Sequence, residues 1–310
     1  MPELIFHHYP NSPFSEKVRL IFGFKQLAWT SVLIPVIMPK PDVVALTGGY
    51  RRTPILQIGA DIYCDTALIC DVLEQRAPTP TLYPAAQAGM ARTLAQWADT
   101  TLFWTAIGYA FQPAGIQSMF GNLPPEHAKA FGADRAAMRG NAARMAAAEA
   151  TANLTTYLDR LENMLRAGPY FLLGNSPTIC DFSVYHAIWY VRRVQNLAGI
   201  LDRAPRLLDW ADRMAAFGHH ESKKCTSIEA IEIARTSTPA TASAALVDVH
   251  GIALGAQVTV TPTDYALDPV AGTLVEASAD RLAIARSDPR AGDVVVHFPR
   301  IGFELKAVVA

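Results

Sequence analysis

The fold is decided near the amino terminus by the stretch Tyr9–Arg19, which has the sequence YPNSPFSEKVR. An apolar run, Leu4–Phe6, precedes it, and an amphipathic segment continues to about Gln26. This order predicts a strand, a tight turn and a helix. Ser12 suits the N-cap of that helix and Pro13 its first position, where the N–H that proline lacks would have no partner in any case.

The start of this predicted helix is a place that stabilises an anion. Unpaired backbone N–H groups and the helix dipole create a positive potential there. A thiolate held at such a position has its pKa lowered from about 8.5 toward neutrality. Ser-Pro before a helix is also common capping chemistry, so this stretch alone favours a structural role, and the segments that follow carry the functional interpretation.

The composition bounds the class of protein. The chain has 310 residues, of which 51% are hydrophobic and 18% charged, enough for two or three domains with cores of their own. The formal net charge is −1, and Lys and Arg do not cluster, so we expect neither nucleic acid nor a membrane as a partner. We also expect no signal peptide. The cysteines show neither C-x-x-C nor metal spacing, which predicts reduced thiols, no metal site and a cytoplasmic protein: Cys64, Cys70, Cys180 and Cys225.

A compact first module is predicted over residues 1–78. After the first strand and helix, Ala28–Ile37 has the pattern of a second strand. Thr53–Gly59 and Asp61–Cys64 are expected to form a hairpin, and Asp65–Glu74 a helix. The resulting β-α-β and β-β-α units end at a proline-rich linker that begins with Pro78.

A second region, residues 85–225, is predicted to be helical. Met90–Gln112 and Ala128–Ala167 carry apolar residues at helical spacing and are expected to be bundle helices. Thr178 and Asp181 have the spacing of a capping box before an apolar helix that continues to Val194. The role of Asp181 is therefore expected to be structural.

A third region, residues 240–310, is predicted to be a small, autonomous β-rich domain resembling a barrel. Short alternating apolar runs separated by turns indicate strands. From Arg235 onward the sequence contains eight Asp and Glu residues and six Arg and Lys residues. This slightly acidic balance argues against a surface that binds a nucleic-acid backbone. Tyr265, His297 and Arg300 could form a site, but we expect them to be isolated rim residues and expect this domain to contribute no ligand-binding residue to the first module.

Three motifs in this order resemble the thioredoxin-like N-terminal domain of the cytosolic glutathione S-transferases, in their serine-type form. They are Ser12-Pro13-Phe14 at the start of a helix, Arg51-Arg52-Thr53-Pro54 before a hairpin, and Asp65-Thr66 at the start of the next helix. The resemblance covers about residues 1–225. It implies a multidomain chain with an α/β module, an all-α bundle and an additional β-rich region.

The resemblance implies that Ser12 donates a hydrogen bond to the thiolate of glutathione. Tyr9 and His8 remain alternatives, because some classes of the family use a tyrosine on the first strand. We favour Ser12 because it alone lies at the helix start. Serine at both positions 12 and 15 leaves no cysteine pair for a redox role.

Further residues are implied to bind the peptide. Pro54 would follow a cis bond, and the backbone of Thr53 would pair with the cysteinyl unit, so the change from the family's valine keeps the contact. Asp65 and Thr66 replace the family's Glu-Ser pair and would bind the α-amino and α-carboxylate groups of the γ-glutamyl unit. Arg51 or Arg52 would pair with the glycyl carboxylate, and the sequence leaves open which.

The implied function is that of a glutathione transferase, with glutathione as cosubstrate and a small apolar electrophile as its partner in conjugation, isomerisation or cleavage. The pocket for the electrophile is expected along one helix that contains Phe103, Trp104, Ile107, Tyr109 and Phe111. A homodimer is implied by the resemblance alone. The alternative is a non-catalytic binding or scaffold protein whose β-rich domain recognises a partner. The intact set Ser12, Pro54, Asp65 and Thr66 favours the enzyme.

Overall fold

The computed structural model describes residues 2–166, 168–240 and 249–308. Its first module has the predicted β-α-β and β-β-α units. Strand β1 is parallel to β2 and antiparallel to β3, which in turn is antiparallel to β4. The second strand is shorter than predicted. The elements are β1 (Ile5–His8), α1 (Pro13–Phe24), β2 (Trp29–Leu33), α2 (Pro41–Thr47), β3 (Ile55–Ile58), β4 (Asp61–Cys64) and α3 (Thr66–Arg76).

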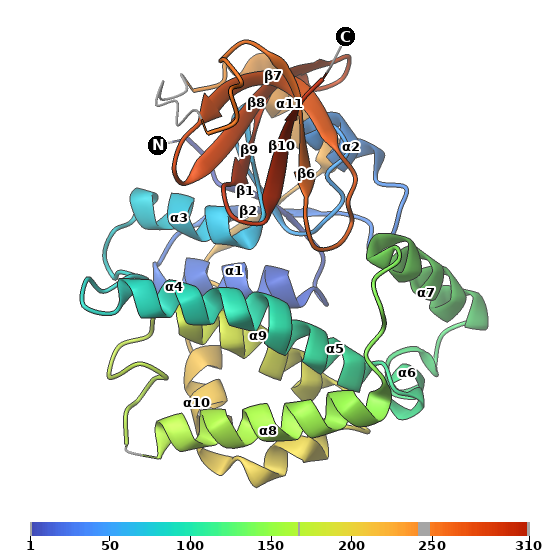
Figure 1. The fold of residues 1–310 in the computed structure, drawn as a ribbon, viewed down its shortest axis with the longest axis vertical. Helices are drawn as coiled ribbons and strands as arrows, with labels where there is room; N and C mark the ends of the chain where they lie inside the picture. The colour runs from blue at the N-terminus through green and yellow to red at the C-terminus, as the bar shows by residue number, and fades with distance from the viewer. Residues whose placement is uncertain (1, 167, 241–248, 309–310) are drawn as a thin grey trace.

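The second region is helical, as predicted, and lies below the strands in Figure 1. The segment predicted as one helix over Met90–Gln112 is two α-helices joined by a π-helical turn. The segment predicted over Ala128–Ala167 holds two separate helices, and Ala167 itself lies outside the described residues. The elements are α4 (Ala88–Trp97), η1 (Ala98–Leu102), α5 (Phe103–Ala110), α6 (Pro113–Phe120), α7 (Pro125–Arg139), α8 (Ala147–Leu165), α9 (Ile179–Arg193), η2 (Ala198–Arg203) and α10 (Pro205–Ala215).

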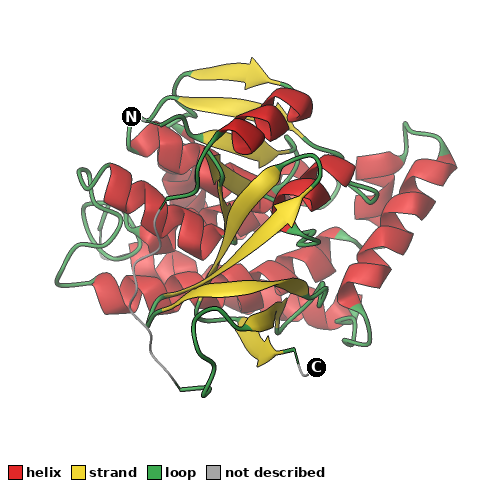
Figure 2. Cartoon of the chain, turned by 90° about the horizontal axis from the view of Figure 1, so that it is seen from above, coloured by secondary structure: helices red, strands yellow, loops and turns green. Residues whose placement is uncertain are grey.

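The chain then returns to the sheet. Its remaining elements are β5 (Ser222–Cys225), α11 (Ser227–Thr236), β6 (Gln257–Pro262), β7 (Val270–Ala277), β8 (Arg281–Asp288), β9 (Gly292–Pro299) and β10 (Phe303–Ala307). The ten strands within the described residues form one sheet in the order β10-β6-β7-β8-β9-β4-β3-β1-β2-β5. Figure 2, in which the chain is seen from above, shows the twist of the strands, with helices of the second region behind them.

The additional β-rich region is confirmed, but it is not the autonomous barrel that we expected. Strand β9 pairs in parallel with β4, placing His297 opposite Tyr63, and the backbone N–H of Val295 donates to the carbonyl of Ala60 at 3.0 Å. The alternation of apolar residues predicts strands, but it does not say which strand edge each one joins. Residues 241–248 and 309–310 of the predicted domain lie outside the described residues.

The two faces of the sheet build two apolar cores, because neighbouring side chains on a strand point to opposite faces. Phe6 and Leu56 face the helices of the second region. Ile5 and Ile55 face a core shared with α2, α11 and the C-terminal strands, to which Phe298 also belongs. This shared core is the physical reason that the third region is not independent. Within the described ranges, no helix is both long and apolar enough to cross a membrane.

Candidate active site

Ser12 lies where β1 gives way to α1 and caps that helix, as predicted. Its Oγ accepts a hydrogen bond from the backbone N–H of Ser15 at 3.1 Å, and Pro13 occupies the first turn. The residue is buried, with 2% of its surface exposed. In this cap Oγ accepts a hydrogen bond at the positive end of the helix, and the Ser12 side chain also interacts with the hydroxyl of Tyr9.

The two alternatives to Ser12 differ in their surroundings. His8 uses both ring nitrogens, with Nδ1 3.0 Å from Nη1 of Arg19 and Nε2 2.9 Å from Oγ of Ser31. Burial, assisted by the charge of Arg19, lowers the pKa of His8 to about 3. Tyr9 is half-buried beside Ser12, and burial raises the pKa of its hydroxyl. His8 is therefore a neutral, fully bonded core residue, whereas Tyr9 stays an alternative.

The peptide bond between Thr53 and Pro54 is cis, as predicted. The two arginines before it point to different partners. Arg51 forms an ion pair with Asp134 of α7 at 2.6 Å, whereas Arg52 is buried and bonds to Asp264 of the C-terminal region. Of the two, only Arg52 lines the main cleft described below.

Asp65 and Thr66 form the junction between β4 and α3, as predicted. Asp65 is the N-cap, and its carboxylate accepts from the backbone N–H of Ala67 at 2.9 Å. Its backbone has φ +74°, a left-handed conformation that strains a residue with a side chain. Burial raises the pKa of Asp65. An ammonium group next to this carboxylate would stabilise its ionised form.

A buried ion pair lies next to this junction and was missed from the sequence. Nζ of Lys17 is 2.6 Å from Asp99 and 3.3 Å from Oγ1 of Thr66, and the other Asp99 oxygen is 2.9 Å from Nε2 of His186. Burial alone would lower the pKa of Lys17, but the nearby carboxylate of Asp99 outweighs burial, and the pKa of Lys17 is raised. Burial alone would raise the pKa of Asp99, but the charge of Lys17 outweighs it, and the pKa of Asp99 is lowered. Single Lys and Asp residues on separate helices give no sequence signal.

Lys40 was also missed. This buried lysine lies at the start of α2, and its Nζ donates to Oγ1 of Thr53 at 3.1 Å. Burial, with Arg135 next in importance, lowers the pKa of Lys40 to about 8. Lys40 thereby places a cation directly behind the Thr53–Pro54 segment.

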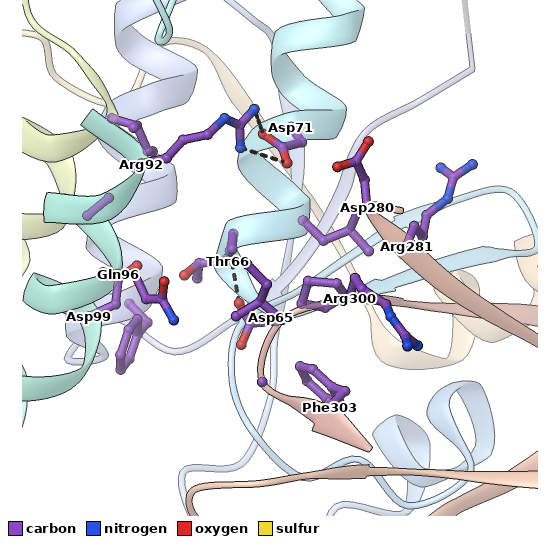
Figure 3. Close-up of a pocket in the computed structure, with 18 of the residues that line it drawn as sticks. Asp65, Thr66, Asp71, Arg92, Gln96, Asp99, Asp280, Arg281, Arg300 and Phe303 are labelled. Atoms are coloured by element: carbon purple, nitrogen blue, oxygen red, sulfur yellow. Dashed lines mark hydrogen bonds and ion pairs between the residues drawn. The ribbon is translucent and has the colours of Figure 1, made fainter. Parts of the chain in front are cut away.

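These groups meet at a cleft of about 780 Å³ between α1, α3, α4 and the C-terminal strands. Among the predicted site residues, Arg52, Thr53, Pro54, Asp65 and Thr66 line it, while Ser12 and Arg51 do not; Phe14, two residues after Ser12, does. Figure 3 shows Asp65 and Thr66 facing Gln96 and Asp99 across it. Tyr265 and Arg300 also line the cleft, so the expectation that they are isolated rim residues was wrong.

His297 has a different place. It is buried, with Nε2 2.8 Å from Asp61 and its ring stacked on Tyr63, so it joins β9 to β4. Asp181 is structural, as predicted: its side chain completes a capping box and accepts from the indole N–H of Trp210 at 3.0 Å. Among the described residues, no group of three or more His, Cys, Asp or Glu could hold a metal ion.

The aromatic residues predicted to hold an electrophile divide into two groups. Phe103 contacts Phe14 with ring centroids 4.6 Å apart, and the half-exposed Trp104 contacts Tyr265 at 5.0 Å. Tyr109 is instead a buried core residue that donates to the carbonyl of Leu197. The first two residues of α5 thus contact residues that line the cleft, although neither of them lines it itself.

Comparison with known proteins supports the resemblance. The family model described as glutathione S-transferase, N-terminal domain, matches residues 6–81, and the corresponding C-terminal domain model matches residues 144–213. The crystal structure of a GST-like protein from Pseudomonas syringae is 42% identical, with a TM-score of 0.82, over 99% of this chain and 100% of that one. The chain belongs to the glutathione S-transferase family. Because the match spans 99% of the chain, the C-terminal strands of this transferase-family protein are shared with that relative.

More distant structures share the fold alone. A glutathione S-transferase from Rhodospirillum rubrum F11 is 18% identical over 69% of this chain and 88% of its own, with a TM-score of 0.52. A beta-etherase from Sphingobium sp. strain SYK-6 is 19% identical over 69% of this chain and 95% of its own, with a TM-score of 0.51. No curated protein sequence matches the chain.

Proposed function

We propose that this family member is a glutathione transferase that activates the thiol of glutathione for attack on a small apolar electrophile. The observation that supports the proposal is the arrangement of Thr53–Pro54 and the Asp65–Thr66 helix start around one cleft, which α1 lines with Phe14 and Lys17. Ser12 caps the same helix. The Ser12 hydroxyl would donate to the thiolate, and the α1 dipole would lower the pKa of the thiol further.

Each end of the tripeptide has a complementary charge in this proposal. Asp65 binds the α-ammonium of the γ-glutamyl unit, while Thr66 and the α3 N-terminus bind its α-carboxylate. Lys17, 3.3 Å from Oγ1 of Thr66, adds positive charge to the same end. Thr53 pairs with the cysteinyl backbone. Arg52, which lines the cleft, takes the glycyl carboxylate in preference to Arg51, which is bonded to Asp134.

The electrophile lies beside the sulfur, against the apolar start of α5. Trp104 is exposed and offers aromatic surface there, with the buried Phe103 behind it, so that an apolar molecule is held without ionic contacts. Bringing the two reactants together contributes to the rate because it removes the entropic cost of their encounter. A cytoplasmic homodimer, as the family resemblance implies, is part of the same proposal, and sedimentation velocity of the purified protein measures the assembly.

Calorimetric titration with reduced glutathione, followed by conjugation assays with a panel of apolar electrophiles, tests the proposal. Saturable binding and turnover of at least one electrophile are expected. Binding without any turnover would favour the alternative, a non-catalytic transferase-fold protein. A lack of binding at millimolar glutathione would contradict both the glutathione site and the enzyme.

A further inference from the structure

The loop between β6 and β7 reaches from the C-terminal region into the cleft. It contains Asp264 and Tyr265, both of which line the cavity. The Tyr265 ring lies edge-on to the ring of Trp104, and the backbone N–H of Ala266 donates to the carbonyl of Met138 at 2.6 Å. One loop thus contacts two helices of the second region, α5 and α7.

The same loop holds Arg52 of the first module. Nη2 of Arg52 donates both to the Asp264 carboxylate and to the carbonyl of Tyr265. The guanidinium also lies over the Tyr265 ring, with Cζ 3.8 Å from the ring centroid. Such a cation–π contact strengthens when it is removed from water, and Arg52 is 8% exposed. The orientation of Arg52 is therefore determined by residues more than 200 positions away in the chain.

Two further observations indicate that this arrangement serves a ligand. The Nε–H of Arg52 is buried and has no hydrogen-bond partner among the described residues, although a buried donor without an acceptor is costly. Ala266, next to Tyr265, has φ +46°, a left-handed conformation that strains an alanine. The loop that holds Arg52 is therefore strained, and Arg52 keeps one buried N–H donor that has no acceptor among the described residues.

We propose that Asp264 and Tyr265 are positioning residues that fix Arg52 for the terminal carboxylate of the peptide, so that the C-terminal region is a specificity element of the active site. This inference rests on the proposed function, since it assigns a role at the same cleft. The recognised ligand class is a thiol peptide with a free carboxylate at the end opposite its γ-glutamyl unit. Asp65 and Thr66 hold the γ-glutamyl end, which leaves the second carboxylate for Arg52.

Preorganisation is the physical reason for such a device. A free arginine side chain loses considerable rotamer entropy when it binds a carboxylate, and holding it in place beforehand removes that cost from the binding step. The planar guanidinium has five donors, so the two bonds made by Nη2 leave others for a ligand. Asp264 offsets part of the charge of Arg52 while the cleft is free.

The test compares two ligands and four variants: Tyr265→Ala, Tyr265→Phe, Asp264→Ala and the control Tyr170→Ala. Glutathione and its glycyl ethyl ester differ only in the terminal carboxylate, and calorimetry gives the dissociation constant of each. The wild-type protein is expected to prefer glutathione, and Tyr265→Ala to lose about tenfold in affinity for glutathione while its affinity for the ester stays unchanged. Tyr265→Phe keeps the ring and is expected to restore the preference. Tyr170→Ala removes an exposed tyrosine that also lies against an arginine, Arg213, but does not line the cleft, and it serves as the matched control.

The outcomes are distinguishable. If Tyr265→Ala lowers the affinity for both ligands equally, Tyr265 only shapes the cleft wall. If Asp264→Ala raises the affinity for glutathione, Asp264 competes with the ligand for Arg52. Either result overturns the inference. A wild type that binds both ligands equally, but loses conjugation activity on substitution of Ser12, overturns this inference and leaves the proposed function standing. A wild type that binds neither ligand overturns both.

Discussion

At the scale of single residues, the site contains two kinds of group. Some hydrogen-bonding residues lie in local motifs that can be recognised in the sequence, whereas some charged residues lie in no such motif. Ser12, Pro54, Asp65 and Thr66 stand in recognisable local motifs, since a cap or a proline acts on its immediate neighbours. Lys17 carries no such mark. Its importance depends on Asp99, 82 positions away, which only the packing of α1 against the second region brings within 2.6 Å.

The Ser12 hydroxyl can be tested apart from its capping role. We expect Ser12→Gly to lower the conjugation rate at neutral pH by about tenfold to a hundredfold, because a hydrogen bond to a charged group contributes about 1.5–3 kcal/mol. Glycine caps a helix nearly as well as serine, so the melting temperature should change little. Glutathione affinity should fall much less than the rate. Unchanged turnover in Ser12→Gly, together with an impaired Tyr9→Phe, would move the catalytic role to Tyr9.

The Lys17–Asp99 pair should show an asymmetry between its partners. The side chain of Lys17 is 1% exposed and that of Asp99 18%, so Asp99→Asn leaves the more deeply buried charge without its partner. We expect Asp99→Asn to lower the free energy of unfolding by about 3 kcal/mol and Lys17→Met by less. Urea denaturation measures both. Equal losses, or none, would contradict this account of the pair.

The pH dependence of this pair follows from the direction of each shift. The pKa of Asp99 is lowered in the folded protein, so its contribution to stability is present above the unfolded-state pKa of about 3.9 and is lost as the pH falls through the folded value. The pKa of Lys17 is raised, so its contribution is lost only as the pH rises above about 10.4. Urea midpoints of the wild type and Asp99→Asn should therefore converge in acid and differ constantly between about pH 5 and 9.

At the scale of elements, the sequence predicted strands and helices well and their partners poorly. Pro13, Asp65 and the capping box at Thr178 set helix starts through local bonds, so these positions were predictable. Strand β5 was not predicted, because its exposed sequence, Ser-Lys-Lys-Cys, has no apolar alternation, and it is a strand because the free edge of β2 offers a partner. The pairing of β9 with β4 was not predicted either, because the sequence does not show which strand edge is free to pair.

This pairing has a measurable consequence in unfolding experiments. All five tryptophans precede residue 211, so their fluorescence reports mainly on the first two regions, although Trp104 also contacts Tyr265. Circular dichroism reports in addition on the C-terminal strands. Because these strands share a core with the first module, we expect the two urea transitions to coincide. A separate transition seen only by circular dichroism would indicate an autonomous domain. A soluble fragment of residues 1–235 with unchanged stability would indicate the same.

At the scale of the whole molecule, the cleft is assembled from all three regions of the chain. Asp65 comes from the first module, Asp99 from the helical region and Tyr265 from the C-terminal strands. A ligand that binds this cleft therefore contacts all three regions, which we expect to unfold together. The sequence motifs predict the residues that the first module contributes to the cleft. The residues from the helical region and from the C-terminal strands reach the cleft only through tertiary packing.

Ligand binding should accordingly stabilise the entire protein. At a glutathione concentration one hundred times the dissociation constant, linkage predicts about 2.7 kcal/mol of added stability. Differential scanning calorimetry should show one transition that moves upward with ligand. Glycylglycine, which lacks the thiol and the γ-glutamyl group, is the control and should leave the transition in place. A transition that splits on addition of glutathione would contradict the single cooperative unit.

The sheet order also bears on how the chain acquires its structure during synthesis. His297 of β9 lies beside Asp61 of β4, 236 positions earlier, so the β4 edge emerges from the ribosome long before its partner. Until then an unpaired strand edge and an apolar sheet face are available to other chains, which is a hazard for aggregation. Pairings this distant in sequence also form slowly. Nascent chains that end before β9 should therefore depend on chaperones, and pairing of β9 with β4 should release that dependence.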